Sequence, residues 1–326
     1  MNHFSSPPIT RPCDAGSLVR LTTYGSLFVL AIVCAIAVGR GLSLGIQPAP
    51  LLIAIMFAAA LIWVWWRHER PSGDRRLADS ALAMLCLFGG GLAGGLVCLI
   101  GQTFAQPFID QALHQADLAL GIDIPGIVAA MARVDGFPAF LEIAYNSSFP
   151  LIFGSTLALI WIGRRDRALE LCGIFNACLI VTAIASALIP AAGAFQFLAM
   201  PEVVRSALPA GAGVYHLADL AALRSATRFV IDPTHLQGVA TFPSFHTALA
   251  LMTISAWRDF PFGRITMLMW QSFVILSTLA IGGHYGVDLL AGGLVWAAIH
   301  GLWALATRQP STRAADALER EALARA

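Results

Sequence analysis

The sequence predicts an all-α membrane protein, a polytopic helical bundle with about eight transmembrane helices and a six-helix core. Its 326 residues are 58% hydrophobic and only 12% charged, whereas soluble domains carry roughly 25% charged residues. Apolar runs recur along the chain, each close to the ~20 residues that a helix needs to cross the hydrocarbon core. The runs show no alternation of polar and apolar residues, which disfavours a transmembrane barrel.

Eight apolar runs are the candidate transmembrane helices. They cover approximately residues 21–39, 48–66, 80–104, 138–162, 168–190, 241–257, 264–282 and 286–306. No small-residue cleavage pattern follows the first run, so we expect it to be a retained anchor and not a signal peptide. Overlapping G-x-x-x-G spacings between Gly89 and Gly95 predict close helix packing in the third run.

A polar, turn-rich stretch at 67–79 separates the first two runs from the other six. The expected organisation therefore has three parts: residues 1–79 form an N-terminal tail and two transmembrane helices, residues 80–306 form the six-helix core, and residues 307–326 form a cytoplasmic tail. All residues that suggest chemistry lie in the second part.

The distribution of positive charge predicts the topology. The 20 basic residues are all arginine. Fifteen of them fall in the N-terminus, the C-terminal tail and the loops at 67–79, 163–168 and 258–264. The positive-inside rule then places both termini in the cytoplasm. Segments 105–137 and 191–240 would face outward, which is the periplasm if the membrane is a bacterial inner membrane, as the all-arginine, Ala- and Gly-rich composition suggests.

Two histidines and one aspartate are expected to meet at the outward face. His246 lies in the first outward turn of the run at 241–257, and His284 lies at the outward junction of the last two runs. Asp288 follows His284 by four residues, which puts both side chains on one helical face. A carboxylate in that position can accept the imidazole N–H and select the tautomer. Such an imidazole is a competent nucleophile toward phosphorus.

The outward segment 191–240 supplies candidate binding residues. Arg224 and Arg228 are four residues apart, so a helical turn would place both guanidinium groups on one face. Guanidinium forks match phosphate oxygens, which makes this pair the predicted phosphate-binding residues. Ser244 is predicted to donate a further hydrogen bond to the phosphoryl group. Tyr285 and His216 are possible headgroup contacts.

The two histidine segments resemble motifs of a known family. Phe242-Pro243-Ser244-Phe245-His246 and Gly283-His284-Tyr285-Gly286-Val287-Asp288 look like the second and third motifs of the type 2 phosphatidic acid phosphatase superfamily. The resemblance implies that His284 forms a phosphohistidine, that Asp288 activates it, and that His246 protonates the leaving group. No metal and no cofactor are expected, because the arginines can neutralise the phosphoryl charge that Mg²⁺ handles in other enzymes.

The departures from that family pattern favour one branch of it. The first phosphatase motif contains a lysine, and the sequence has none. Ser277-Thr278 stands where the third motif usually has Ser-Arg, and Phe245 stands where the second motif has glycine. These features, with the His-Tyr-x-x-Asp form, resemble the inositol phosphorylceramide synthase (inositolphosphotransferase) branch.

The expected function is therefore a lipid phosphotransferase. It would move a phosphoryl-headgroup unit from a phospholipid or polyprenyl phosphate to a lipid alcohol such as ceramide or diacylglycerol. One alternative is a lipid or polyprenyl phosphate phosphatase that uses water. A second alternative is a membrane transporter or assembly factor. In a third, His246, His284 and Asp288 form a two-His, one-carboxylate metal site. No nucleic-acid partner is expected.

Overall fold

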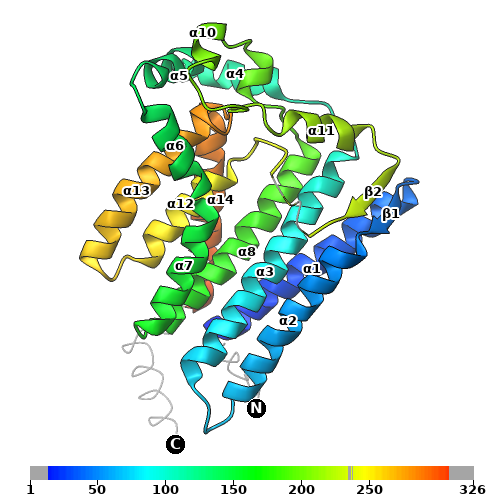
Figure 1. Ribbon diagram of the computed structural model, residues 1–326, viewed down its shortest axis with the longest axis vertical. Helices are drawn as coiled ribbons and strands as arrows, with labels where there is room; N and C mark the ends of the chain where they lie inside the picture. Colours follow the sequence, from blue (N-terminus) through cyan, green and yellow to red (C-terminus); the bar gives the residue numbers. More distant parts are fainter. Residues whose placement is uncertain (1–13, 234–235, 237, 308–326) are drawn as a thin grey trace, which may run out of the picture.

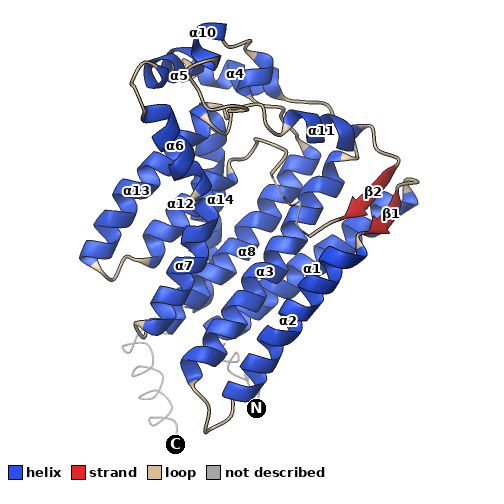
Figure 2. Cartoon of the chain, in the orientation of Figure 1, coloured by secondary structure: helices blue, strands red, loops and turns tan. Residues whose placement is uncertain are grey.

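The computed structural model describes residues 14–233, 236 and 238–307 of the chain. The expected cytoplasmic tail therefore lies, apart from its first residue, outside the described residues. The described part is mainly helical, with a single pair of short strands (Figure 2). The elements are α1 (Ala15–Gly39), β1 (Ser43–Ile46), α2 (Pro48–His68), α3 (Arg75–Gln102), α4 (Asp110–Ala119), α5 (Ile124–Ala132), α6 (Phe137–Asn146), α7 (Ser148–Trp161), α8 (Arg165–Leu188), α9 (Ala194–Phe197), α10 (Glu202–Arg205), α11 (Leu217–Arg224), β2 (Arg228–Ile231), α12 (Phe245–Ala256), α13 (Pro261–Ala280) and α14 (Gly286–Thr307).

Six of the described helices are long and apolar enough to cross a membrane: α1, α2, α3, α8, α13 and α14. The protein is thus a multi-pass membrane protein. The run expected at 138–162 is instead two helices, α6 and α7, which meet at a bend of 50°. The run expected at 241–257 yields only α12, which has 12 residues. The count of about eight is reached only when bent pairs are included.

Segment 105–137, expected as an outward loop, contains its own helices. Helices α4 and α5 meet at a bend of 82°, and with α10 they cover one end of the bundle (Figure 1). The turns α2–α3 and α7–α8, which carry many of the arginines, lie at the opposite end (Figure 1). This separation of arginine-rich turns from the capping helices is the one that the charge pattern predicts.

Glycines bring α3 and α8 into close contact, as the G-x-x-x-G spacing predicts. A Cβ atom at Gly90 would overlap the side-chain amide of Asn176, and one at Gly94 would overlap Leu179. The side-chain amide of Asn176 lies at this contact and donates a hydrogen bond to the Thr23 hydroxyl of α1 at 2.9 Å. The N-terminal helix α1 therefore shares a buried interface with the helices of the expected core.

The outward segment is tied to the N-terminal helices by β1 and β2, which pair in parallel with Ser43 opposite Arg228. Four-residue strands leave almost no periodic signal, and the sequence did not predict them. This pairing corrects the expectation that Arg224 and Arg228 lie on one face of a helix. Helix α11 ends at Arg224 and the chain is extended from Arg228, so the two arginines do not share a helical face.

The α3–α8 contact predicts that two neighbouring glycine substitutions in α3 change the stability of the protein in opposite directions. Gly90→Ala should lower the melting temperature of the detergent-solubilised protein, because the new methyl group overlaps Asn176 and overpacking costs about 1–3 kcal/mol. Gly91→Ala is the matched control, since its Cβ would make only ordinary contact with Phe175 and alanine is favoured in helices by roughly 1 kcal/mol. Equal melting temperatures for both variants would contradict this packing account.

Candidate active site

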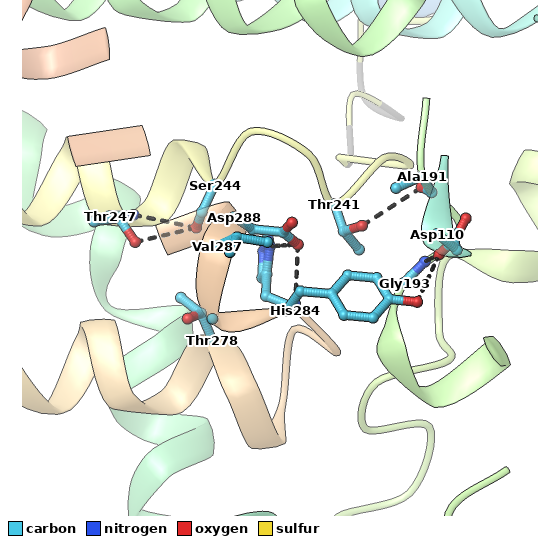
Figure 3. Close-up of polar contacts among 12 residues, drawn as sticks. Asp110, Ala191, Gly193, Thr241, Ser244, Thr247, Thr278, His284, Val287 and Asp288 are labelled. Atoms are coloured by element: carbon cyan, nitrogen blue, oxygen red, sulfur yellow. Dashed lines mark hydrogen bonds and ion pairs between the residues drawn. The ribbon is translucent and has the colours of Figure 1, made fainter. Parts of the chain in front are cut away.

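His284 and Asp288 form a hydrogen-bonded pair at the start of α14. His284 lies in the turn between α13 and α14, where its backbone N–H donates to the Thr278 carbonyl at 3.2 Å. Its Nδ1 lies 3.2 Å from Oδ2 of Asp288, and the same oxygen accepts the Tyr285 N–H at 3.0 Å (Figure 3). An Nδ1–H donated to this carboxylate leaves Nε2 as the unprotonated nitrogen of the ring.

Burial keeps the His284 ring neutral. The residue is 5% exposed, and this desolvation lowers the pKa of His284 to about 4, while a backbone hydrogen bond with Thr241 acts in the opposite direction. Asp288 is fully buried, and its Oδ1 has no hydrogen-bond partner among the described residues. The pair is therefore a neutral imidazole oriented by a carboxyl group, in surroundings that exclude most water.

Backbone contacts hold the start of α12 against α14. Ser244 is the N-cap of α12, where its Oγ accepts from the Thr247 N–H at 3.4 Å. The Ser244 N–H donates to the Asp288 carbonyl at 3.0 Å, and a Cβ at Gly292 would overlap the Ser244 carbonyl oxygen. The two sequence segments, about 40 residues apart, thus meet through main-chain atoms.

His246 follows that cap and faces aromatic side chains. Its ring stacks on Tyr145 of α6, with centroids 4.1 Å apart and an interplanar angle of 21°. The edge of Phe149 approaches it at 6.0 Å. Tyr145 also lies beside Gly282, the residue two before His284. One aromatic ring therefore links the two histidine segments.

His246 and His284 line the same cavity, which has a volume of about 1000 Å³. His216 lines it as well, with Nε2 2.8 Å from the Ala192 carbonyl oxygen, and burial lowers the pKa of His216. The Tyr145 and Tyr215 hydroxyls meet at 2.8 Å on its wall. The polar end of the cavity is thus built from three imidazoles and two phenols.

Several expected binding residues lie elsewhere. Arg224 donates to the Gln106 carbonyl at 2.8 Å and lies 3.9 Å above the Phe108 ring. Arg228 belongs to β2, where its guanidinium lies beside Gly45. No arginine is among the described residues that line the cavity. Arg224 and Arg228 therefore do not contact the histidine pair in this arrangement, because strand pairing and the Gln106 contact direct them away.

Tyr285 also differs from the expectation of a headgroup contact. Its side chain is fully buried, and its hydroxyl donates to Oδ1 of Asp110 at 3.1 Å. The phenol thus shares the Asp110 carboxylate with the backbone N–H groups of the 191–193 loop. Ser244 is likewise fully buried and is not among the residues that line the cavity.

Two buried aspartates in α4 support the site, and sequence reasoning missed both. Asp117 accepts the N–H groups of Gly286 and Val287 at 2.9 and 2.8 Å. Asp110 accepts the N–H groups of Ala192 and Gly193 at 2.9 and 2.8 Å. One carboxylate thus satisfies the N-terminus of α14, where a negative charge is favoured, and the other fixes the loop beside His216.

A sequence signal for these aspartates exists. They are seven residues apart, which is two helical turns, so one helical face would carry both. Segment 105–137 has no apolar run long enough to span a membrane, so hydropathy predicts a loop there and does not reveal this helical spacing. Among the described residues, no group of three or more His, Cys, Asp or Glu side chains could hold a metal ion, so the geometry gives the metal alternative no support.

Fold and site together define a multi-pass membrane protein with a histidine–aspartate pair at the end of a large, mainly apolar cavity. A sequence profile of the PAP2 superfamily matches residues 111–302. The match covers more than half of the chain and includes His246, His284 and Asp288, and the protein belongs to this superfamily. It is thus a phosphatase-type enzyme of lipid-like substrates. Comparisons with curated proteins and with solved structures find no match.

The Asp117 contacts predict a structural cost. Asp117→Ala should lower the melting temperature, because it leaves two N–H groups at the buried start of α14 without an acceptor, at about 1–3 kcal/mol for each group. Asp123→Ala is a suitable control, since Asp123 precedes α5 and has no side-chain cap hydrogen bond. An unchanged melting temperature for Asp117→Ala would mean that the carboxylate does not hold the helix end.

The lowered pKa of His284 predicts that the stability of the wild type depends on pH more strongly than the stability of a variant without this histidine. The pKa of this histidine is about 6.5 in the unfolded state and about 4 in the folded state. Between these two pH values the unfolded state binds a proton at His284 and the folded state does not. Stability from the neutral ring is therefore complete above pH 6.5 and is lost as the pH falls toward 4. The melting temperature should drop more between pH 7 and pH 5 in the wild type than in His284→Asn. Parallel curves would contradict a neutral, buried His284.

Proposed function

We propose that the protein is a lipid phosphotransferase that works through a phosphohistidine on His284. In the first step, Nε2 attacks the phosphorus of a phospholipid or polyprenyl phosphate, the P–N bond forms, and the P–O bond to the leaving group breaks. His246 gives its proton to the departing oxygen. The observation that carries this proposal is the hydrogen bond between Nδ1 of His284 and Asp288, on the wall of a cavity that His246 also lines.

In the second step a lipid alcohol takes the phosphoryl unit. His246, now neutral, accepts the hydroxyl proton, the new P–O bond forms, and the P–N bond to His284 breaks. Asp288 stabilises the positive charge that grows on the imidazole ring at each transition state. The negative charge of the bound phosphoryl group favours the protonated form of His246 before the first step.

The acceptor decides between the two activities of this class. Transfer to an alcohol such as ceramide or diacylglycerol is supported by the surroundings of His284, which is 5% exposed and opens on a largely apolar cavity. Water as the acceptor would make the protein a lipid or polyprenyl phosphate phosphatase. The missing lysine of the phosphatase-type first motif is a further reason to place the protein in the inositol phosphorylceramide synthase-like branch.

The charge of the phosphoryl group needs compensation. Arg224 remains the candidate cation, because its Nη1 is buried and has no hydrogen-bond partner among the described residues. In this proposal the bound donor lipid draws that nitrogen toward the phosphoryl oxygens. Arg228, exposed on β2, and Ser244 are the weaker candidates. The Tyr145 and Tyr215 hydroxyls, which already lie on the cavity wall, are neutral donors for the same oxygens.

The topology proposed with this function follows the arginine pattern. Both termini lie in the cytoplasm, the membrane is a bacterial inner membrane, and the capped end of the bundle faces the periplasm. Under this arrangement the reaction takes place near the outer leaflet.

Trapping the intermediate tests the mechanism. Purified wild-type protein incubated with phospholipid labelled at phosphorus should form an acid-labile, base-stable phosphoenzyme. His284→Asn should form none, and His246→Asn should form it more slowly by about 10²- to 10⁴-fold, the usual contribution of a general acid. His114→Asn is the control, because His114 does not line the cavity. A normal phosphoenzyme yield from His284→Asn would refute the assigned nucleophile.

Product analysis with a competing acceptor tests the transferase. With labelled phospholipid and ceramide or diacylglycerol present, the label should appear in a new lipid, and Arg224→Gln should raise KM more than Arg228→Gln does. Recovery of the label as a water-soluble phosphate, whether or not an alcohol is present, would identify the phosphatase instead.

A further inference from the structure

One wall of the cavity comes from a helix outside the family match. The match begins at residue 111, whereas α2 ends at His68 and contributes a stripe of residues to the cavity. These residues are Pro50, Ile53, Ala54, Phe57, Ala58 and Leu61. Their spacing of three and four residues places them on one helical face. The inner face of α2 is therefore directed at the cavity.

This face contacts α3 and the edge of the core but is not itself buried. Over its whole described length α2 has no buried residue, and it packs mainly on α3. Gly91 and Gly95 of α3 also line the cavity, and a glycine gives no side chain to fill the space between the helices. Helix α2 thus borders an apolar channel and adds no buried residue to the core.

Aromatic side chains bridge the three helices around this channel. The rings of Phe57 in α2 and Phe88 in α3 lie 4.9 Å apart edge to face, and Phe88 lies 4.9 Å from Phe153 in α7. All three line the cavity whose other end holds His246 and His284. The cavity is therefore polar at the histidines and apolar along α2, α3 and α7.

We propose that this channel binds the hydrocarbon tail of the substrate whose phosphoryl group reacts at His284, and that α2 determines which tails are accepted. The inference rests on the proposed function, because it assigns the head of the same molecule to the histidines. Glu142 carries the only carboxylate among the described lining residues, so the channel wall matches an alkyl tail. A volume of about 1000 Å³ lies at the upper end of the range of roughly 300–1000 Å³ for ligand pockets, more than a headgroup needs.

Two neighbouring alanines of α2 give a matched test. Ala58 lines the channel and Ala59 does not, being exposed on the outer side of the helix. Ala58→Trp should lower kcat/KM for a dipalmitoyl phospholipid by at least tenfold and change that for the dihexanoyl analogue less than twofold. Ala59→Trp should change neither by more than twofold. Equal losses for both tail lengths, or no loss for either, would overturn the proposal.

A second measurement needs no variant and no turnover. Hexadecyl phosphonate with a diazirine at the tail end, which carries no ester to cleave, is photo-crosslinked to the wild-type protein, and the adducts are mapped by mass spectrometry. Adducts should fall on the channel residues of α2, α3 and α7 and decrease when unlabelled hexadecyl phosphonate is added. Adducts spread evenly over the outer face of α2 would refute the proposal.

A hexadecanol probe with the same diazirine separates the substrate's tail from bulk lipid. Labelling of the channel should be several-fold weaker with the alcohol, which has no anionic head to seat at the histidines. Equal labelling would show that any membrane lipid occupies the channel and would overturn the assignment to the substrate. If the phosphonate labels the channel and no phosphate ester is turned over, the proposed function fails while the binding assignment stands.

Discussion

The site depends on how the protein satisfies polar groups at a buried helix start. The first N–H groups of α14 have no partners within the helix, and Asp117 and Asp288 accept three N–H groups between Tyr285 and Val287. Because Asp288 makes one of these contacts with the same oxygen that faces His284, the His284 ring is oriented by the interaction that begins the helix. Burial of this arrangement also keeps the imidazole neutral.

The rest of the bundle supports that junction. Close contacts at glycine join α3 to α8 and α14 to the start of α12, and the loop beside His216 is fixed by Asp110. Helix α2 has a different place in the structure, since it borders the cavity without contributing a buried residue. The histidine pair lies within the region that matches the family, whereas the cavity wall formed by α2 lies outside it.

Much of the site could be predicted from local sequence. His284 and Asp288 are four residues apart, and this spacing predicts their contact, although His284 lies in the turn that precedes α14. The four-residue spacing failed for Arg224 and Arg228, because α11 ends at Arg224 and Arg228 belongs to β2, which pairs with β1, 185 residues earlier in the chain. The seven-residue spacing of Asp110 and Asp117 places both on one helical face, but their partners lie in the 191–193 loop and at the start of α14. No local pattern identifies contacts with such distant segments.

The sequence by itself determined the membrane-spanning class, the arginine-rich end of the bundle and the His–Asp pair, because hydropathy, charge and helical spacing act over one helix or less. Only the tertiary structure decided which side chains share a cavity with His246, where the arginines point, and that α2 forms a wall. Those outcomes depend on contacts between segments far apart in the chain, whose geometry is set by packing and by hydrogen bonds between main-chain groups.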